Sequence, residues 1–254
     1  MKNSHLLTYL AKNPSLIFSK PKRIFMLSHM RSRSSLLSHI IGSNNEISGY
    51  SELSIPYSKS FGLEKQKVIL HKDELAVNSS MKLFDKILHN SFDFKELSIL
   101  NSTDNDVVIM IRNPRATIKS IVTMGVKNNN AKYADINWAC EYYKERVTKI
   151  VKMSSSLERF FLLDSEAIVD SPVESLNQLS EYLNLSTPLS PQYDSFNKTG
   201  MKKSGDTSEN IKKGEIVKTK ENNDIVIPED ELSSLESFYL QSLKTLRAHS
   251  ISAN

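Results

Sequence analysis

The most constraining feature of this sequence is a continuous apolar segment, Val107–Ile111, which reads VVIMI. An apolar run without alternation predicts a strand that is covered on both faces, as in a parallel sheet. Pro114 follows shortly after, and proline is favoured in the first turn of a helix, so a helix is expected over about 114–124. A buried strand that leads directly into a helix is the building unit of an α/β fold.

Further strands and helices are expected to alternate along the chain. Short apolar runs predict buried strands at three places: 23–28, 46–50 and 160–163. The spacing of apolar residues predicts four more helices: 34–41, 131–157, 172–183 and 228–249. Residues 80–88 fit a strand or a helix, and residues 1–20 form a short helix or an irregular arm. This alternation predicts a three-layer α/β/α fold with a central parallel sheet, in a single domain over residues 1–254.

Length and composition agree with one such domain. The chain has 254 residues, of which 39% are hydrophobic, enough for a substantial core. It has no apolar run of about 18 residues and no convincing signal peptide, so we expect a cytoplasmic protein without a membrane span. The net charge of +4 does not indicate nucleic acid, but it suits an anionic ligand if basic residues converge. The single cysteine, Cys140, excludes an intramolecular disulfide and is interpreted as a core thiol, and no metal-ligand spacing occurs.

The first candidate anion site lies in residues 25–40, FMLSHMRSRSSLLSHI, which predict a strand, a turn and a helix. The turn holds two arginines and three serines: Arg31, Ser32, Arg33, Ser34 and Ser35. A helix that begins near Ser34 offers free backbone N–H groups and a positive dipole end, and Arg31 adds a permanent forked charge. The glycines and the Lys-Ser/Thr pair of a nucleotide-kinase loop are absent. The alternative is a serine cap with solvated arginines.

The second candidate anion site follows the strand at 107–111. Arg112 and Arg115 come at its expected carboxyl end, where open α/β sheets bind ligands. Ser120 comes eight residues after Arg112, inside the predicted helix. Arg112 and Ser120 are therefore expected to contact one phosphate from two sides. The alternative is a surface cluster of arginines.

Together these residues resemble the sulfotransferase family that uses 3′-phosphoadenosine-5′-phosphosulfate, a branch of the P-loop-hydrolase-like superfamily. The family's loop P-R-S-G-[ST]-[ST]-L is similar to residues 30–36, and its motif R-[ND]-P-R-x-x-x-x-S is similar to residues 112–120. Weaker likenesses cover 162–185 and 205–217. Arg33 stands where the family usually has glycine. Either the loop is strained there, or it takes another path in which Arg33 adds a phosphate contact.

The resemblance implies transfer of a sulfuryl group from this co-substrate to an acceptor hydroxyl, without a metal. The first loop would bind the 5′-phosphosulfate through Arg31, Ser32, Arg33, Ser34 and Ser35. Arg112 and Ser120 would bind the 3′-phosphate. A loop expected over 195–224 would close on the nucleotide with Lys212, Lys213 and Gly214.

The transfer itself requires cations near the leaving oxygen and a base for the acceptor proton. Arg31 and Lys86 are the candidate cations, although Lys86 would otherwise form a surface pair with Asp85. Three residues are candidate bases: Glu52, His89 and His71. Glu52 is favoured because by resemblance it falls where some members, notably the tyrosylprotein branch, place a catalytic glutamate. His89 lies in the segment KLFDKILHN, which resembles the strand where other members have Lys and His near the donor. A solvated glutamate and a structural histidine are the alternatives.

The sequence does not identify the acceptor, which could be a carbohydrate, a lipid, a peptide tyrosine or a polyketide hydroxyl. Tyr50, Tyr57 and Trp138 line an acceptor pocket or pack in the core. One rival interpretation is a kinase or hydrolase of related fold, which the missing glycine–lysine loop disfavours. Another is a non-catalytic nucleotide- or nucleic-acid-binding module, which the pI of 8.9 favours and the lack of interleaved aromatic residues disfavours. We expect no nucleic-acid partner, and the oligomeric state is not readable.

Overall fold

The computed structural model describes residues 1–59, 61–200, 209–218 and 224–251. In this part of the chain a five-stranded sheet has the order β2-β3-β1-β4-β5, and all its neighbouring strands are parallel. Its strands are β1 (Lys22–Leu27), β2 (Ile47–Ser48), β3 (Lys82–Ile87), β4 (Asn105–Ile111) and β5 (Phe161–Asp164). The predicted α/β fold with a central parallel sheet is confirmed. The ambiguous segment at 80–88 is a strand because it pairs with β1 and β2 on its two sides.

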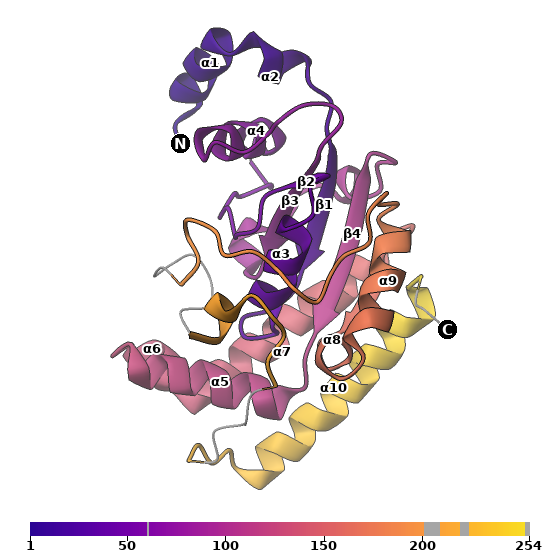
Figure 1. Ribbon diagram of the computed structural model, residues 1–254. Helices are drawn as coiled ribbons and strands as arrows, with labels where there is room; N and C mark the ends of the chain where they lie inside the picture. The colour runs from indigo at the N-terminus through magenta and orange to yellow at the C-terminus, as the bar shows by residue number, and fades with distance from the viewer. Residues whose placement is uncertain (60, 201–208, 219–223, 252–254) are drawn as a thin grey trace.

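Helices cover both faces of the sheet (Figure 1). One face is covered by α3 (Ser34–Gly42), α8 (Ala167–Asp170) and α9 (Pro172–Tyr182), and the other by α7 (Ile136–Ser154) and α10 (Glu229–His249). Side chains of β1 alternate between these layers: Ile24 and Met26 pack toward α3, whereas Phe25 and Leu27 pack toward α7 and α10. Apolar residues therefore occupy both faces of the central strands, as expected for a sheet buried on both sides.

The remaining helices extend this core. Helix α5 (Pro114–Lys127) packs against α7 and α10, and α1 (Asn3–Lys12) packs against α2 (Pro14–Phe18) and α4 (Gly62–Lys72). Figure 1 shows these last three together at the end of the sheet opposite to α5. The described residues also include three short 3-10 helices: η1 (Asn90–Phe92), η2 (Leu97–Ile99) and η3 (Glu209–Lys213).

The helix predicted over 131–157 is wrong in one respect, because it consists of two helices. Helix α6 (Ala131–Ala134) ends before Asp135, whose backbone is extended and whose carboxylate accepts the Trp138 N–H at 3.2 Å as the cap of α7. The break lets α6 cross α5 at Gly125, where an added Cβ would lie 2.2 Å from the backbone nitrogen of Ala134. The capping residue ends one helix and begins the next.

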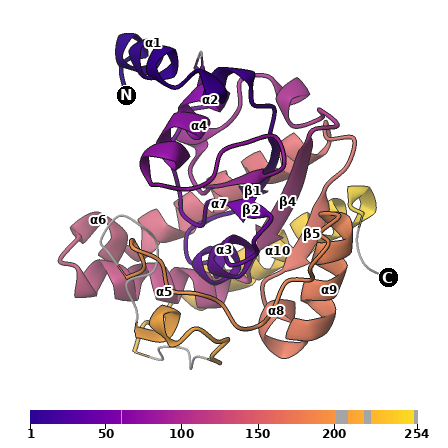
Figure 2. The same ribbon diagram turned by 45° about the horizontal axis from the view of Figure 1, so that its top comes forward.

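The chain beyond α9 crosses α3 on the outer side of the sheet (Figure 2). Asn44 donates to the carbonyl of Thr187 at 2.8 Å, and His39 of α3 contacts the Thr199 hydroxyl at 2.9 Å. The loop expected over 195–224 thus lies beside the helix that follows the first motif. It is interrupted by η3, and its residues 201–208 and 219–223 lie outside the described residues.

Candidate active site

The first predicted motif forms the turn between β1 and α3. Helix α3 begins at Ser34, as predicted, and Arg33 is its capping residue. Arg31 and Arg33 both have positive φ values, of 61° and 69°. Left-handed backbone disfavours residues with a Cβ, so this turn carries the strain expected where arginine replaces glycine.

The Arg33 side chain ties this turn to the segment after β5. Its guanidinium donates to the carbonyl oxygen of Ser165 at 2.9 Å and forms an ion pair with Glu166 at 2.5 Å. These contacts orient the Arg33 side chain toward the segment after β5. The predicted contact of Arg33 with the donor nucleotide stays a prediction. The contact between Arg33 and Glu166 was not predicted from the sequence.

The two predicted anion motifs meet in one hydrogen-bonded group. The Arg31 Nε donates to the Ser120 hydroxyl at 2.8 Å, and the Arg112 guanidinium donates to the Arg31 carbonyl at 3.1 Å. Arg31 comes from the turn before α3, whereas Arg112 and Ser120 come from the end of β4 and from α5. Because β1 and β4 are adjacent and parallel, their carboxyl ends bring these residues to the same edge of the sheet.

Glu166 completes this charged group, and sequence reasoning did not single it out as a site residue. Its Oε1 accepts from Arg112 Nε at 3.3 Å and from Asn113 Nδ2 at 3.1 Å, while Oε2 accepts from Arg33. The only sequence signal was its position in the weak likeness over 162–185. We call the side chains of Arg31, Arg33, Arg112, Ser120 and Glu166 the charged rim.

Arg115 does not join the charged rim. Its guanidinium donates to the Glu236 carboxylate on α10 at 3.2 Å, and both side chains are nearly half exposed. Helical geometry explains the difference, because Arg112 precedes α5 whereas Arg115 lies within its first turn and turns outward. The two arginines of the motif therefore face different surroundings.

Helix α7 holds the main chain beneath the charged rim, which the sequence did not predict. Arg146 is 1% exposed, and its guanidinium donates to the carbonyls of Ser28 and Ile87, each at 2.8 Å, and to the Asp93 carboxylate at 2.9 Å. The Tyr142 hydroxyl accepts from the Met30 N–H at 2.9 Å and donates to the Leu88 carbonyl at 2.8 Å. These bonds satisfy buried backbone groups just beyond β1 and β3, where the sheet ladder has ended.

His29 and Tyr143 hold the main chain of Arg112. The His29 Nε2 accepts from the Arg112 N–H at 3.0 Å, so its Nδ1 carries the proton and donates to the Met30 carbonyl at 2.9 Å. Complete burial lowers the pKa of His29 to about 4, which keeps the ring neutral. The Tyr143 hydroxyl donates to the Arg112 carbonyl at 2.8 Å. We call the main chain held by α7 and His29 the strand-end platform.

Lys86 lies beside the start of α3. It is 1% exposed, and its ammonium group donates to the Ser35 hydroxyl at 3.1 Å. The alternative of a surface pair with Asp85 is wrong, because successive strand residues face opposite sides of the sheet and both residues are buried. Ser32 and Ser34 are also buried, and the Ser32 hydroxyl lies 2.7 Å from that of Ser28.

The candidate bases occupy different surroundings. Burial raises the pKa of Glu52, against the smaller opposing effect of the positive charges of Lys86 and Arg146. Burial lowers the pKa of His89, whose ring packs against Phe92 and Tyr142. His71 instead contacts the Tyr9 hydroxyl at 2.9 Å, between α4 and α1, at the opposite end of the sheet. Glu52 is the candidate that combines desolvation with the nearby charge of Lys86, the proposed cation at the start of α3.

The lysines of the predicted closing loop lie on η3. Lys212 and Lys213 are exposed, and Ile211 beside them is buried in the core under α3. Gly214 has a φ of 72°, and its carbonyl accepts from the Tyr193 N–H at 2.8 Å. A glycine suits this turn because an added Cβ would also lie 3.0 Å from the Tyr193 carbonyl oxygen. Contact of these residues with a nucleotide stays a prediction.

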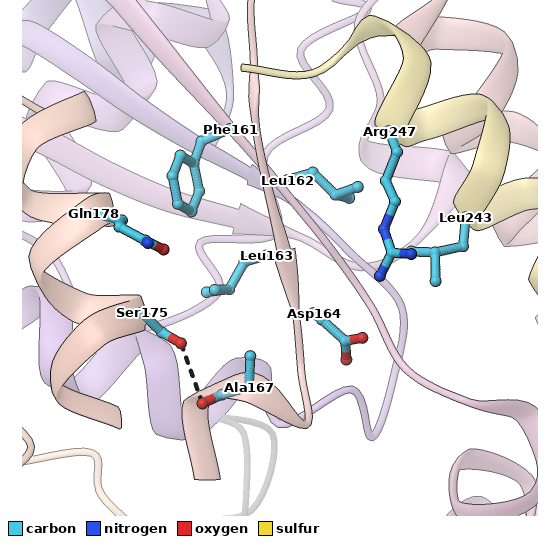
Figure 3. Close-up of a pocket in the computed structure, with 9 residues that line it drawn as sticks. All are labelled: Phe161, Leu162, Leu163, Asp164, Ala167, Ser175, Gln178, Leu243 and Arg247. Atoms are coloured by element: carbon cyan, nitrogen blue, oxygen red, sulfur yellow. Dashed lines mark hydrogen bonds between the residues drawn. The ribbon is translucent and has the colours of Figure 1, made fainter. Parts of the chain in front are cut away.

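Two hollows lie away from Lys86. One, of about 160 Å³, follows the edge of β5 between α9 and α10 and is lined by Leu163, Asp164 and Arg247 among others (Figure 3). The other, of about 390 Å³, lies between the start of α5 and α10, beside Asn113 and Arg115. The second hollow is lined by Asn113, whose amide donates to Glu166 of the charged rim, whereas the first follows the edge strand β5.

Other predictions concern groups outside this site. Cys140 is buried, and desolvation raises its pKa to about 11, as expected of a core thiol. Within the described part of the chain, no helix is long and apolar enough to cross a membrane. The same residues contain no group of three histidine, cysteine or acidic side chains suited to hold a metal.

Comparison with known proteins identifies the fold. No protein-family model and no curated protein matches the sequence. Among solved structures, a sulfotransferase domain from the curacin biosynthetic pathway is 17% identical with a TM-score of 0.54, covering 87% of this chain and 98% of that one. A sulfotransferase domain from the olefin synthase of Synechococcus PCC 7002 is 17% identical with a TM-score of 0.57, covering 87% and 96%. A sulfotransferase from Alicyclobacillus acidocaldarius is 13% identical with a TM-score of 0.56, covering 91% and 95%.

These three proteins are similar to this chain along nearly their whole length. Their identities are low, so the likeness concerns the fold rather than individual residues. The central parallel sheet flanked by helices is consistent with it. This chain therefore has the α/β fold of sulfotransferase domains.

Proposed function

We propose that this protein transfers a sulfuryl group from 3′-phosphoadenosine-5′-phosphosulfate to an acceptor hydroxyl. The observation that carries the proposal is the hydrogen-bonded group of Arg31, Arg112 and Ser120 at the carboxyl edge of the sheet. Two motifs that lie about eighty residues apart in the sequence meet there, which gathers forked cationic donors suited to one phosphate beside the helix start that would hold the other end of the nucleotide. The sulfotransferase fold supports the same function.

The charged rim would hold the 3′-phosphate. Arg112 and Arg31 supply forked donors, and Ser120 supplies a hydroxyl that contacts Arg31. Glu166 would keep Arg112 oriented before the nucleotide arrives. Lys212, Lys213 and Gly214 would approach the same phosphate from η3.

The start of α3 would hold the 5′-phosphosulfate. Residues 32–35 present the backbone N–H groups and the positive dipole end of the helix. Ser32 would contribute its N–H, since its hydroxyl is turned toward Ser28. The Lys86 ammonium, which is hydrogen-bonded to Ser35, would lie near the oxygen that bridges phosphorus and sulfur.

The chemical step is an in-line displacement at sulfur. The acceptor oxygen forms a bond to sulfur while the bond from sulfur to the bridging phosphate oxygen breaks, leaving 3′-phosphoadenosine-5′-phosphate. Lys86 would stabilise the charge that develops on this leaving oxygen. Arg31, assigned by sequence to the same oxygen, contacts Ser120, so we now assign its main role to the 3′-phosphate.

Glu52 would take the acceptor proton. Its carboxylate is desolvated and close to Lys86, which suits a base that acts beside the leaving group. His89 is the second candidate, because its lowered pKa keeps it neutral and able to accept a proton at pH 7.

Calorimetry with 3′-phosphoadenosine-5′-phosphate tests the nucleotide assignment. We expect saturable one-to-one binding of this nucleotide and much weaker binding of ATP, which lacks the 3′-phosphate. Release of the desulfated nucleotide from the donor, in a screen of hydroxyl acceptors, then tests the reaction. Equal binding of both nucleotides, or no binding of either, would contradict the proposal.

A further inference from the structure

Asp85 is a buried acidic residue that the proposed reaction does not use. It lies on β3 and is 1% exposed, and desolvation raises its pKa to about 7. Two hydrogen bonds to its carboxylate oppose the effect of burial. Asp85 Oδ1 accepts from the Leu53 N–H at 3.0 Å, and Oδ2 accepts from the Tyr57 hydroxyl at 2.8 Å.

Both donors belong to the segment that follows Glu52. The Leu53 N–H is part of the peptide unit that joins Glu52 to Leu53, and this unit is planar, so holding the N–H also holds the Cα of Glu52. Ser54 next to it has a positive φ of 53°, a conformation that serine keeps only where its surroundings impose it. The segment is therefore fixed on both sides of a strained residue.

Tyr57 makes the second attachment rigid. Its ring packs against Phe25 of β1 and stacks on Phe94, with ring centroids 5.2 Å and 4.8 Å apart. The ring is 4% exposed, so Tyr57 belongs to the core rather than to an acceptor pocket. Its hydroxyl has a buried partner in Asp85, which satisfies the polar end of an otherwise apolar contact.

Asp85 and Lys86 are neighbours on β3 with opposite orientations. Lys86 reaches Ser35 on the α3 side, whereas Asp85 reaches Leu53 and Tyr57 on the other side. We infer that Asp85 is a positioning residue that holds Glu52 in a fixed relation to Lys86, an inference that rests on the proposed function. One strand then sets the place of both the base and the cation.

The test compares Asp85→Ala with Asp85→Asn. Asparagine keeps an oxygen for the Leu53 N–H and presents an amide to the Tyr57 oxygen, so it preserves the attachment without the charge. Asp85→Ala is expected to speed hydrogen exchange at the Leu53 amide and to slow release of the desulfated nucleotide, each by about tenfold or more. Asp85→Asn is expected to keep the wild-type rates of Leu53 exchange and of nucleotide release. The affinity for 3′-phosphoadenosine-5′-phosphate is expected to stay unchanged in both variants.

Asp106→Ala is the matched control, because Asp106 is also a buried aspartate on a central strand but pairs with Arg159 near the amino end of β4. It should lower stability without faster exchange at Leu53. If Asp85→Ala does not fold, Tyr57→Phe removes one attachment and is expected to raise Leu53 exchange by a smaller factor.

Three results would overturn the inference. These are unchanged Leu53 exchange in a folded Asp85→Ala protein, equal acceleration in the Asp106→Ala control, and loss of turnover in Asp85→Asn as large as in Asp85→Ala. Failure of the wild-type protein to bind the nucleotide would instead reject the proposed function, and the exchange result at Leu53 would still show whether Asp85 fixes the Glu52 segment.

Discussion

The strand-end platform and the charged rim lie next to each other but are built in different ways. The platform consists of main-chain groups that receive hydrogen bonds from buried side chains, with Arg146 and His29 at 1% and 0% exposure. The rim consists of side chains that contact one another, and its carboxylate, Glu166, is 36% exposed. An arginine side chain serves in each region. Arg146, which binds the platform, is enclosed by carbonyls and Asp93, whereas Arg31 and Arg112 of the rim lie at the edge of the sheet.

This difference separates folding from ligand binding. A buried guanidinium is tolerated only where fixed acceptors surround it, so the platform contributes to stability and holds the strand ends. The rim arginines Arg33 and Arg112 are paired with a carboxylate that is itself partly exposed, so they can exchange this carboxylate for a phosphate. Substitutions in the platform should therefore change stability first, and substitutions in the rim should change nucleotide affinity first.

The largest effect is expected for Arg146→Met. This change leaves Asp93 and the carbonyls of Ser28 and Ile87 without their buried partner, which costs about 3–5 kcal/mol of unfolding free energy. Thermal unfolding measures it as a fall in Tm of roughly 10 °C for a chain of this size. Lys144→Met is the control on the same helix, since Lys144 and Glu231 are an exposed pair worth under about 1 kcal/mol. Equal falls in Tm for both variants would contradict the distinction.

Arg112→Ala should weaken nucleotide binding with little change in Tm. Loss of a mostly buried charged donor to phosphate costs about 2–4 kcal/mol, or roughly 30- to 1000-fold in Kd. Calorimetry with 3′-phosphoadenosine-5′-phosphate measures it. Arg115→Ala carries the same loss of charge outside the rim and should change Kd by less than about threefold. A similar loss for both arginines would show that net charge, rather than the rim, binds the nucleotide.

Glu52→Gln tests the base and gives a pH signature. We expect turnover to fall by about a hundredfold while nucleotide affinity stays the same. Because burial raises the pKa of Glu52, wild-type activity should rise with pH at higher values than for a solvated glutamate, and this rise should vanish in the variant. The raised pKa also means that the folded state loses stability as Glu52 ionises with rising pH, so Glu52→Gln should have the higher Tm at pH 7. Loss of the pH-dependent rise in His89→Ala alone would assign the base to His89.

Ser120→Ala should produce the smallest effect. It removes one neutral acceptor for Arg31 and one hydroxyl for the phosphate, which is worth about 1 kcal/mol, or roughly fivefold in Kd. Calorimetry under the conditions used for Arg112→Ala measures the difference. A loss as large as that for Arg112→Ala would mean that Ser120 organises the rim rather than adding one contact.

Local sequence patterns predicted the elements that carry the site. The apolar run at 107–111 predicted β4, and Pro114 predicted the start of α5, because the residues that decide these features are neighbours in the chain. The start of α3 at Ser34 was predicted for the same reason. The break at Asp135 was missed because its capping role competes with a helical pattern that continues on both sides.

The contacts of the site depended on residues that are far apart in sequence. Tyr142 and Arg146 gave no motif of their own, since tyrosine and arginine in amphipathic helices are ordinarily surface or core residues, and Glu166 stood only in the weak likeness over 162–185. Arg33 was predicted to be strained or to contact phosphate, and its positive φ agrees with the strain while its guanidinium contacts Glu166.

The sequence by itself determined the α/β layering, the two strand-to-helix turns and the side-chain types available at them, because each depends on hydrophobic period and capping within a few residues. Only the tertiary structure decided that Arg31 contacts Ser120, that α7 holds three strand ends, and that Asp85 holds the segment after Glu52. These contacts form because parallel strands end at a common edge of the sheet. The polar groups buried there need hydrogen-bond partners, and these partners come from residues that are distant in the sequence.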